Sequence, residues 1–166
     1  QGLKDWFSKF LTWMQTSKNG REESESKNNH GTYYDLQITS YALFLGKTEL
    51  AKQTVETAKT KRITVQVEPD GRQPLELVRT KAWSYSIGNL EGLMQLATLA
   101  QKMGVDLWNF QTKDGRGIRK ALDYLYDRLQ KGSGIEPSDV EGAIRMAQAA
   151  DDQLVFPALE KKAKLT

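Results

Sequence analysis

Two short segments of this 166-residue chain carry side chains that could act on an anionic ligand. The first contains Asn28, Asn29 and His30, two amides and the single histidine of the sequence, where a polar stretch meets a helical pattern. Backbone N–H groups at a helix N-terminus point outward and the helix dipole favours an anion, so this junction could bind a carboxylate. The same residues would also be found in a simple helix cap with a surface histidine.

The second segment runs from Gln73 to Tyr85 and contains Arg79. A guanidinium can bind a carboxylate through two parallel hydrogen bonds. A cation beside Tyr85 would favour the phenolate form, which can remove a proton. The alternative interpretation is a surface pair between Arg79 and Glu76, with Tyr85 packed in the core.

The spacing of Arg79 and Tyr85 constrains how they could share a site. Six residues at about 100° each place the two side chains far apart around a straight helix. If both serve one site, the chain must bend between them or they must approach the ligand from different sides. Tyr85 lies on the same helical face as Gly88, Asn89 and Gly92, a small polar face that predicts a cavity or a close helix neighbour.

Apolar residues recur at helical spacing along most of the chain. The pattern predicts helices over 3–14, 32–45, 48–60, 76–103, 118–129, 137–149 and 154–163. Gly46 and Gly104 are expected to end two of them, and Thr48 to cap a third. Segment 16–27 has no apolar residue and is predicted to be an exposed loop, 62–67 an extended connection, and 68–71 a turn.

These elements predict an all-α fold of antiparallel helix pairs, because short connections place consecutive helices side by side. Periodicity leaves a bundle, a solenoid and a ring open. The hydrophobic content of 39% and charged content of 27% indicate a soluble globular domain. No run approaches the roughly 18 apolar residues of a membrane span. No signal peptide opens the chain, and because Gln1 is not an initiator methionine, a fragment or processed product is expected.

Several functional classes are disfavoured by composition. The chain has no cysteine, which removes disulfides, thiolate metal sites and a cysteine nucleophile. The net charge of +3 comes without a dense basic stripe, so nucleic acid is not an expected partner. No carboxylate cluster suggests a metal. Asp35, Asp70, Glu76 and Glu91 have no spacing typical of a glycosidase pair, and Trp108 and Phe110 are expected in the core rather than stacked on a sugar.

Three blocks together resemble the alginate lyase family of helical toroid polysaccharide lyases. They read NNHGTYYDLQ (28–37), PDGRQPLELVR (69–79) and WSY (83–85), and the likeness, which extends over about 27–129, is greatest to the Bacteroides-type branch acting on alginate and glucuronan. Better-known periplasmic members space the arginine and tyrosine seven residues apart, whereas here the gap is six. The resemblance implies an incomplete (α/α) toroid of alternating inner and outer helices around a groove. Residues 1–166 would form the C-terminal part of this single catalytic domain, with the upstream half of the protein as a partner.

The resemblance also implies a reaction. Asn29, His30 and Arg79 would neutralise the carboxylate of a polyuronate, and Tyr85 would act as base and acid in β-elimination, with His30 as base for guluronate. Asn28, Tyr33, Gln73 and Glu76 would be further substrate-binding residues. No cofactor or metal is implied, and the location would be periplasmic or secreted. A helical-toroid glycoside hydrolase and a non-catalytic carbohydrate-binding or scaffold protein remain the alternatives.

Overall fold

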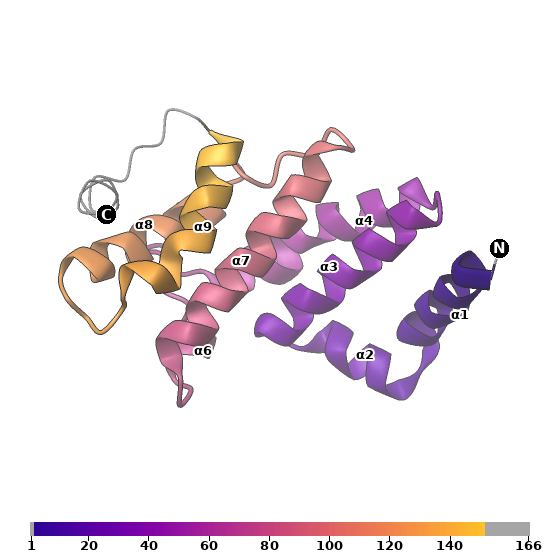
Figure 1. The fold of residues 1–166 in the computed structure, drawn as a ribbon, viewed down its shortest axis with the longest axis horizontal. Coiled ribbons are helices and arrows are strands. Elements are labelled where there is room, and N and C mark those ends of the chain that lie inside the picture. The colour runs from indigo at the N-terminus through magenta and orange to yellow at the C-terminus, as the bar shows by residue number, and fades with distance from the viewer. Residues whose placement is uncertain (1, 152–166) are drawn as a thin grey trace.

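The computed structural model describes residues 2–151, and every regular element in this range is a helix (Figure 1). The elements are α1 (Gly2–Thr16), α2 (Lys18–Glu25), α3 (Asn29–Phe44), α4 (Thr48–Ala58), the π-helix η1 (Lys59–Ile63), α5 (Thr64–Gln66), α6 (Pro74–Leu77), α7 (Ala82–Gln101), α8 (Ile118–Gln130) and α9 (Pro137–Ala150). Within residues 2–151 no helix combines the length and apolarity needed to cross a membrane.

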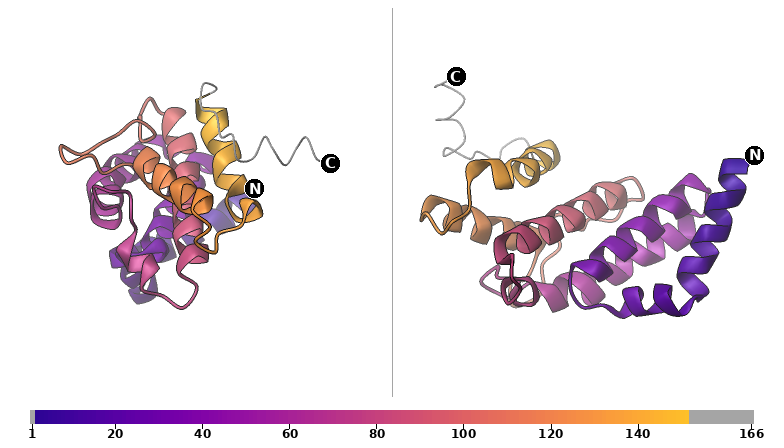
Figure 2. Two further views of the ribbon diagram at one scale, coloured as in Figure 1. Left: turned by 90° about the vertical axis from the view of Figure 1, so that its left-hand side faces the viewer. Right: turned by 60° about the horizontal axis from the view of Figure 1, so that its bottom comes forward.

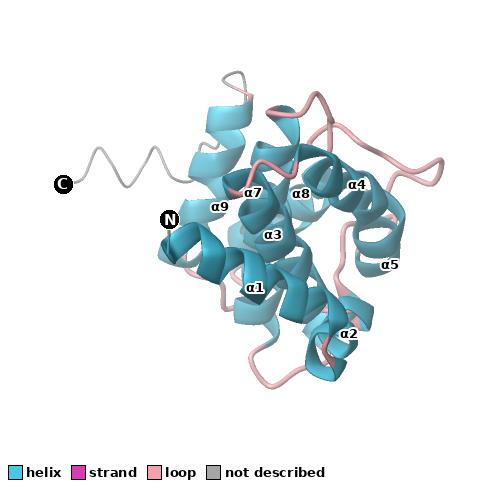
Figure 3. Cartoon of the chain, turned by 90° about the vertical axis from the view of Figure 1, so that its right-hand side faces the viewer, coloured by secondary structure: helices cyan, strands magenta, loops and turns pink. Residues whose placement is uncertain are grey.

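The helices form a layered array in which α3 and α7 lie at the centre (Figures 1 and 2). Helix α3 packs against α4 on one side and α7 on the other, and α7 continues the array by packing against α8 and α9. Helices α1 and α2 form an elbow that packs along α3, and Phe7 of α1 contacts Tyr41 and Phe44 near the C-terminal end of α3 (Figure 3). The short link through Gly46, whose φ is 73°, returns the chain along α3, as the antiparallel arrangement requires.

The main core is built around α7. Its predicted apolar stripe is buried at Ile87, Leu90, Met94 and Ala97, whereas Trp83 is partly exposed. A second, smaller core holds the elbow against α3 and α4, and contains Leu11, Met14, Ile38, Ala42 and Ala51. Helix α3 buries apolar side chains against both cores, and this burial fixes the orientation of α3 relative to its neighbours.

Four predicted helices, 3–14, 32–45, 118–129 and 137–149, are confirmed within one to three residues at each end. The turn at 68–71 is also confirmed, because Gly71 donates its N–H to the carbonyl of Glu68 and has a φ of 90°. The predicted helix at 154–163 lies outside the described residues.

The prediction of an exposed loop at 16–27 is wrong, because residues Lys18–Glu25 form α2. Ser17 caps this helix by accepting the N–H of Gly20 at 3.0 Å. Gly20 itself is buried, and a Cβ there would collide with the carbonyl of Met14. The close approach of the α2 backbone to α1 holds α2 in place, and no apolar stripe is needed. Hydrophobic periodicity therefore could not reveal this helix.

Three other local predictions are wrong. Residues 62–67, predicted to be extended, continue α4 through η1 and α5, because the side chains of Arg62 and Ile63 are both drawn into the interior. Thr48 is not a cap, because Lys47 occupies that position without a side-chain hydrogen bond. The single helix predicted over 76–103 is divided into α6 and α7 by a break at 78–81.

Candidate active site

A buried carboxylate joins the two segments that the sequence singled out. Glu76 is 1% exposed, and its Oε1 accepts the backbone N–H of Asn29 at 2.6 Å. Its Oε2 accepts Nη1 of Arg79 at 2.9 Å. The same Nη1 donates to Oδ1 of Asn29 at 2.9 Å. Two of these three hydrogen bonds, those that involve Asn29, join the first turn of α3 to the end of α6.

This arrangement determines which way the Asn29 amide faces. A guanidinium has donors only, so the Asn29 atom that it contacts must be the carbonyl oxygen. The Nδ2 amide group is then not used by Arg79 and can donate to a ligand. Within residues 2–151 the Nε and Nη2 groups of Arg79 make no hydrogen bond, so they too can donate.

Tyr85 lies directly against Arg79. The guanidinium carbon is 3.4 Å from the centre of the tyrosine ring, a stacked cation–π contact. The contact is possible because α6 ends at Leu77 and α7 begins at Ala82, so the chain bends between the two residues as their spacing required. The Tyr85 hydroxyl has no hydrogen-bond partner in the part of the chain that the structure describes.

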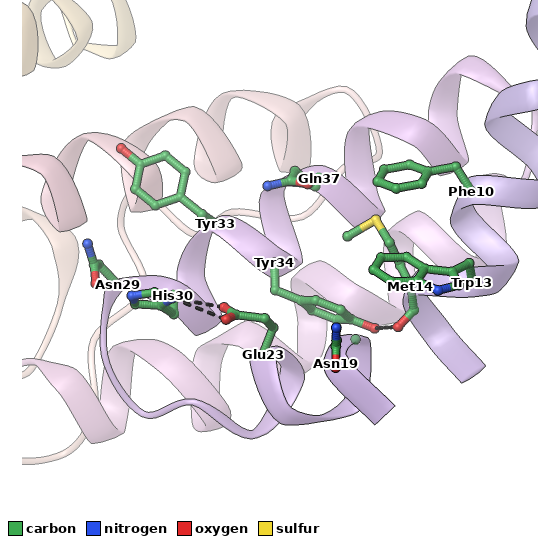
Figure 4. Close-up of a pocket in the computed structure, with 11 residues that line it drawn as sticks. Phe10, Trp13, Met14, Asn19, Glu23, Asn29, His30, Tyr33, Tyr34 and Gln37 are labelled. Atoms are coloured by element: carbon green, nitrogen blue, oxygen red, sulfur yellow. Dashed lines mark hydrogen bonds and ion pairs between the residues drawn. The ribbon is translucent and has the colours of Figure 1, made fainter. Parts of the chain in front are cut away.

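His30 occupies the first turn of α3, whose N-terminus is capped by the Asn28 side chain accepting the His30 N–H at 3.2 Å. The imidazole is about half exposed, and its Nδ1 lies 3.0 Å from Oε2 of Glu23 (Figure 4). An ionised carboxylate only accepts, so Nδ1 is the donor of this pair and Nε2 is left for a ligand. Glu23 was missed by sequence reasoning because it belongs to α2, in the segment predicted to be a loop.

A network of buried amides supports the helices that carry the candidate site residues. Asn89 donates to Oε1 of Gln66 at 2.9 Å and to Oε1 of Gln73 at 2.7 Å. Gln73 donates in turn to the carbonyl of Ser86, and Gln66 to that of Asn28. The network connects α3, α5, α6 and α7. Among the side-chain amides of this network, which all lie within residues 2–151, only Oδ1 of Asn89 is buried without a hydrogen-bond partner, and a network with so many paired groups favours a single arrangement of the elements that it joins.

The residues predicted to bind substrate are therefore placed in different environments. Gln73 and Glu76 are 2% and 1% exposed, and both are committed to partners inside the protein. Asn28 caps α3. Tyr33 lines a cavity beside His30, but its hydroxyl donates to the carbonyl of Gly88 at 2.9 Å.

The contact of Tyr33 with α7 explains the small face that the sequence showed there. A Cβ at Gly92 would lie 3.4 Å from the Tyr33 ring and 3.0 Å from the Thr32 methyl group, so glycine allows α3 and α7 to approach closely. Burial, and then the charge of Glu91, raise the pKa of Tyr33. This phenol therefore stays protonated and serves as a donor rather than a base.

A buried arginine fixes the connection between α2 and α3. Arg62 is 1% exposed and binds Asp35 through Nε at 2.7 Å and Nη2 at 3.0 Å. Its other donations reach the carbonyls of Ser26 and Ser24, each at 2.8 Å. Gly31 leaves room for the guanidinium, because a Cβ there would collide with it. The segment that leads into α3 is thus held by a buried cation that makes four hydrogen bonds.

A cavity of about 330 Å³ opens beside His30 (Figure 4). Asn29, His30, Tyr33 and Glu23 form its polar end, and the side chains of α1 and Tyr34 form its aromatic end. Its lining residues are Phe10, Trp13, Met14, Asn19, Gly20, Glu23, Asn29, His30, Tyr33, Tyr34 and Gln37.

The weaker candidates from the sequence have structural roles. Trp108 is 3% exposed in the main core and Phe110 packs against it, which confirms the expectation for both. Asp35 is committed to Arg62, and Asp70 to a surface pair. Among residues 2–151 no group of three or more His, Asp or Glu side chains could hold a metal ion.

Comparisons with known proteins bear on the family and the fold. The family model described as alginate lyase matches residues 1–134. The structure is similar to the crystal structure of an alginate lyase from Bacteroides ovatus, with a TM-score of 0.88 and 38% sequence identity. The match covers 97% of this chain and 45% of that one, so this chain spans less than half the length of the solved relative. No curated protein matches.

The fold prediction is confirmed. The described residues are all-helical, and the coverage of the relative fits a partial helical toroid. The family match extends over most of the chain and includes all four residues predicted to be catalytic. The chain therefore belongs to the alginate lyase family.

Proposed function

We propose that this chain supplies the catalytic residues of a polysaccharide lyase that cleaves polyuronates such as alginate by β-elimination. One observation carries the proposal: Arg79, held by Asn29 and Glu76, is stacked on Tyr85. Donors for a carboxylate and a candidate base are thereby brought together from two distant segments. Membership of the alginate lyase family supports the same reaction class.

The reaction needs these donors because of the charge that it creates. A uronate carries its carboxylate on C5, and removal of the C5 proton produces an enolate-like dianion. The Asn29 amide and the uncommitted N–H groups of Arg79 would stabilise that charge by hydrogen bonds. Preorganised donors of this kind lower the barrier because they need not reorient during the reaction.

The buried Glu76 carboxylate orients Arg79 but also offsets its formal charge. The Arg79–Glu76 pair is neutral as a unit, so directed N–H donors rather than net charge stabilise the substrate. Because Glu76 is 1% exposed, it acts as a positioning residue and does not contact the sugar. Gln73 has the same status, since its amide is committed to Ser86 and Asn89.

Tyr85 is the proposed base and acid. Its phenolate would take the C5 proton, the C4–O4 bond would break as the C4–C5 double bond forms, and the phenol would then protonate O4. One residue can perform both steps when the proton and the leaving group lie on one face of the sugar, as in mannuronate. For guluronate they lie on opposite faces, and the free Nε2 of His30 would serve as the base.

The test is Tyr85→Phe in the complete protein, assayed by the ultraviolet absorbance of the unsaturated uronate product. Loss of a general acid–base group should lower kcat by about 10²–10⁴-fold while substrate binding persists. Tyr124→Phe is the matched control, because Tyr124 also lies near a guanidinium, that of Arg128 at 5.0 Å, but belongs to α8 and makes no hydrogen bond or ring contact with Asn29, Glu76 or Arg79. Retained turnover in Tyr85→Phe would contradict the assignment, and saturated products would indicate a hydrolase instead.

A further inference from the structure

An aromatic ladder runs along α1 toward the candidate site. Trp6, Phe10 and Trp13 are stacked in sequence, with ring centres 5.1 and 5.6 Å apart and planes within 17° and 12° of parallel. Both tryptophans are about half exposed, at 55% and 48%. Only the Phe10–Trp13 end lines the cavity that contains His30 (Figure 4). One tryptophan of the ladder therefore faces the site and the other does not.

The cavity combines an aromatic floor with polar donors at its rim. Trp13, Phe10 and Tyr34 supply flat apolar surface, and Asn19 and Gln37 supply exposed amides. Neither amide has a hydrogen-bond partner within residues 2–151. The volume of about 330 Å³ lies in the range of small-ligand sites, which typically pair apolar walls with a few directed polar groups.

This chemistry matches a pyranose ring. A sugar presents a C–H face that can lie on an indole, and hydroxyl or carboxylate groups at its edge that need donors. Asn19, Gln37 and His30 interrupt the apolar floor and offer the polar groups that such an edge needs. The cavity is also continuous with the site, because Asn29 and His30 line it.

We propose that this cavity is a sugar subsite. It binds a uronate residue of the same polysaccharide chain, next to the residue held by Asn29 and Arg79. The ring lies on Trp13, and Asn19 and Gln37 bind its polar edge. The inference rests on the proposed function, which supplies the polysaccharide and the neighbouring uronate held by Asn29 and Arg79. Binding at the cavity can nevertheless be tested without turnover.

The experiment measures binding of an alginate-derived tetrasaccharide to the complete protein by calorimetry, in a Tyr85→Phe background that prevents cleavage. Trp13→Ala should weaken binding about tenfold, as expected for an exposed aromatic anchor. Trp6→Ala is the matched control, since it removes the same side chain from the same helix outside the cavity, and should change Kd less than twofold. An Asn19→Ala/Gln37→Ala double variant tests the polar rim through surface residues whose loss does not threaten the fold, and should also weaken binding about tenfold.

The outcomes separate this proposal from the proposed function. With Tyr85 intact, Trp13→Ala should raise KM and leave kcat nearly unchanged. Suppose that alginate is cleaved and that Trp13→Ala, the double variant and Trp6→Ala all bind the tetrasaccharide as tightly as the Tyr85→Phe background. This result would overturn the subsite and leave the lyase assignment standing. Binding that depends on Trp13 without any unsaturated product would support the subsite and overturn the lyase assignment.

Discussion

Replacement of Arg62 by methionine should destabilise the protein strongly, and more at neutral than at acidic pH. Methionine nearly fills the volume but removes both bonds to Asp35 and both bonds to the carbonyls of Ser24 and Ser26. The Asp35 carboxylate, 5% exposed, is then left without a cation. Breaking a buried ion pair in this way typically costs about 3–5 kcal/mol.

Protonation of Asp35 limits how much stability Arg62→Met can lose. Burial raises the pKa of Asp35 even beside Arg62, whose hydrogen bonds and charge lower it. Without Arg62 the pKa rises further, and the folded variant can protonate the carboxyl instead of burying a charge. From the ordinary value of 3.8, that protonation costs about 4.4 kcal/mol at pH 7 and about 1.6 kcal/mol at pH 5.

The sign follows from proton binding. A carboxyl whose folded pKa is raised binds more protons in the folded than in the unfolded state, so stability falls as pH rises above the unfolded value. The difference in unfolding free energy between Arg62→Met and the native protein should therefore shrink by up to about 2.7 kcal/mol from pH 7 to pH 5. The two orphaned carbonyls add about 1 kcal/mol or more at both pH values.

Urea unfolding followed by circular dichroism at both pH values measures these quantities. Arg72→Met is the matched control, because Arg72 pairs with Asp70 at 2.6 Å but both side chains are more than half exposed, and it should cost less than about 1 kcal/mol. Adding Asp35→Leu to Arg62→Met should remove the pH-dependent part. A loss in Arg62→Met that equals that of the control, or that does not change with pH, would refute the reasoning.

Further expectations follow from the same contacts. Gly31→Ala should lower the unfolding free energy by about 2 kcal/mol, because the methyl group would collide with the buried guanidinium of Arg62. Gly88→Ala, which has open space around its Cβ, should raise the unfolding free energy by about 0.5 kcal/mol. Thermal melts compare the two variants. Arg79→Lys should lower kcat/KM about 100-fold while circular dichroism stays native, since an ammonium cannot stack on the ring and hold two partners. Glu23→Ala should slow cleavage of guluronate-rich alginate about tenfold and that of mannuronate-rich alginate much less, because Glu23 orients His30. Glu22→Ala is the control. Equal losses on both substrates would contradict the role given to His30.

The sequence predicts the long helices well because their apolar stripes are continuous. The pattern of Ile87, Leu90 and Met94 alone places α7 in the core. The elements that failed depend on contacts between segments. Helix α2 has no stripe and is held by Ser17 and by the approach of Gly20 to α1, so no local signal distinguishes it from a loop.

The candidate site shows the same division. The resemblance identified Asn29, His30, Arg79 and Tyr85 as a group, and the structure places Asn29, Arg79 and Tyr85 in one chain of contacts, with His30 next to Asn29. It could not show that Glu76 is buried, because a glutamate is usually exposed and only a fold that closes around it reveals its partners.

The π-helical turn Lys59–Ile63 accommodates one extra residue without turning its neighbours away from the interior. Thr64 donates its N–H back five positions to Lys59, so this turn holds one residue more than an α-helical turn. Because the wider turn absorbs that residue, the segments before and after it keep nearly the same facing, and Ala58 before the turn and Gln66 after it are both buried. Deletion of Thr60 should therefore convert the turn to an ordinary α-helical one and leave these side chains in the interior.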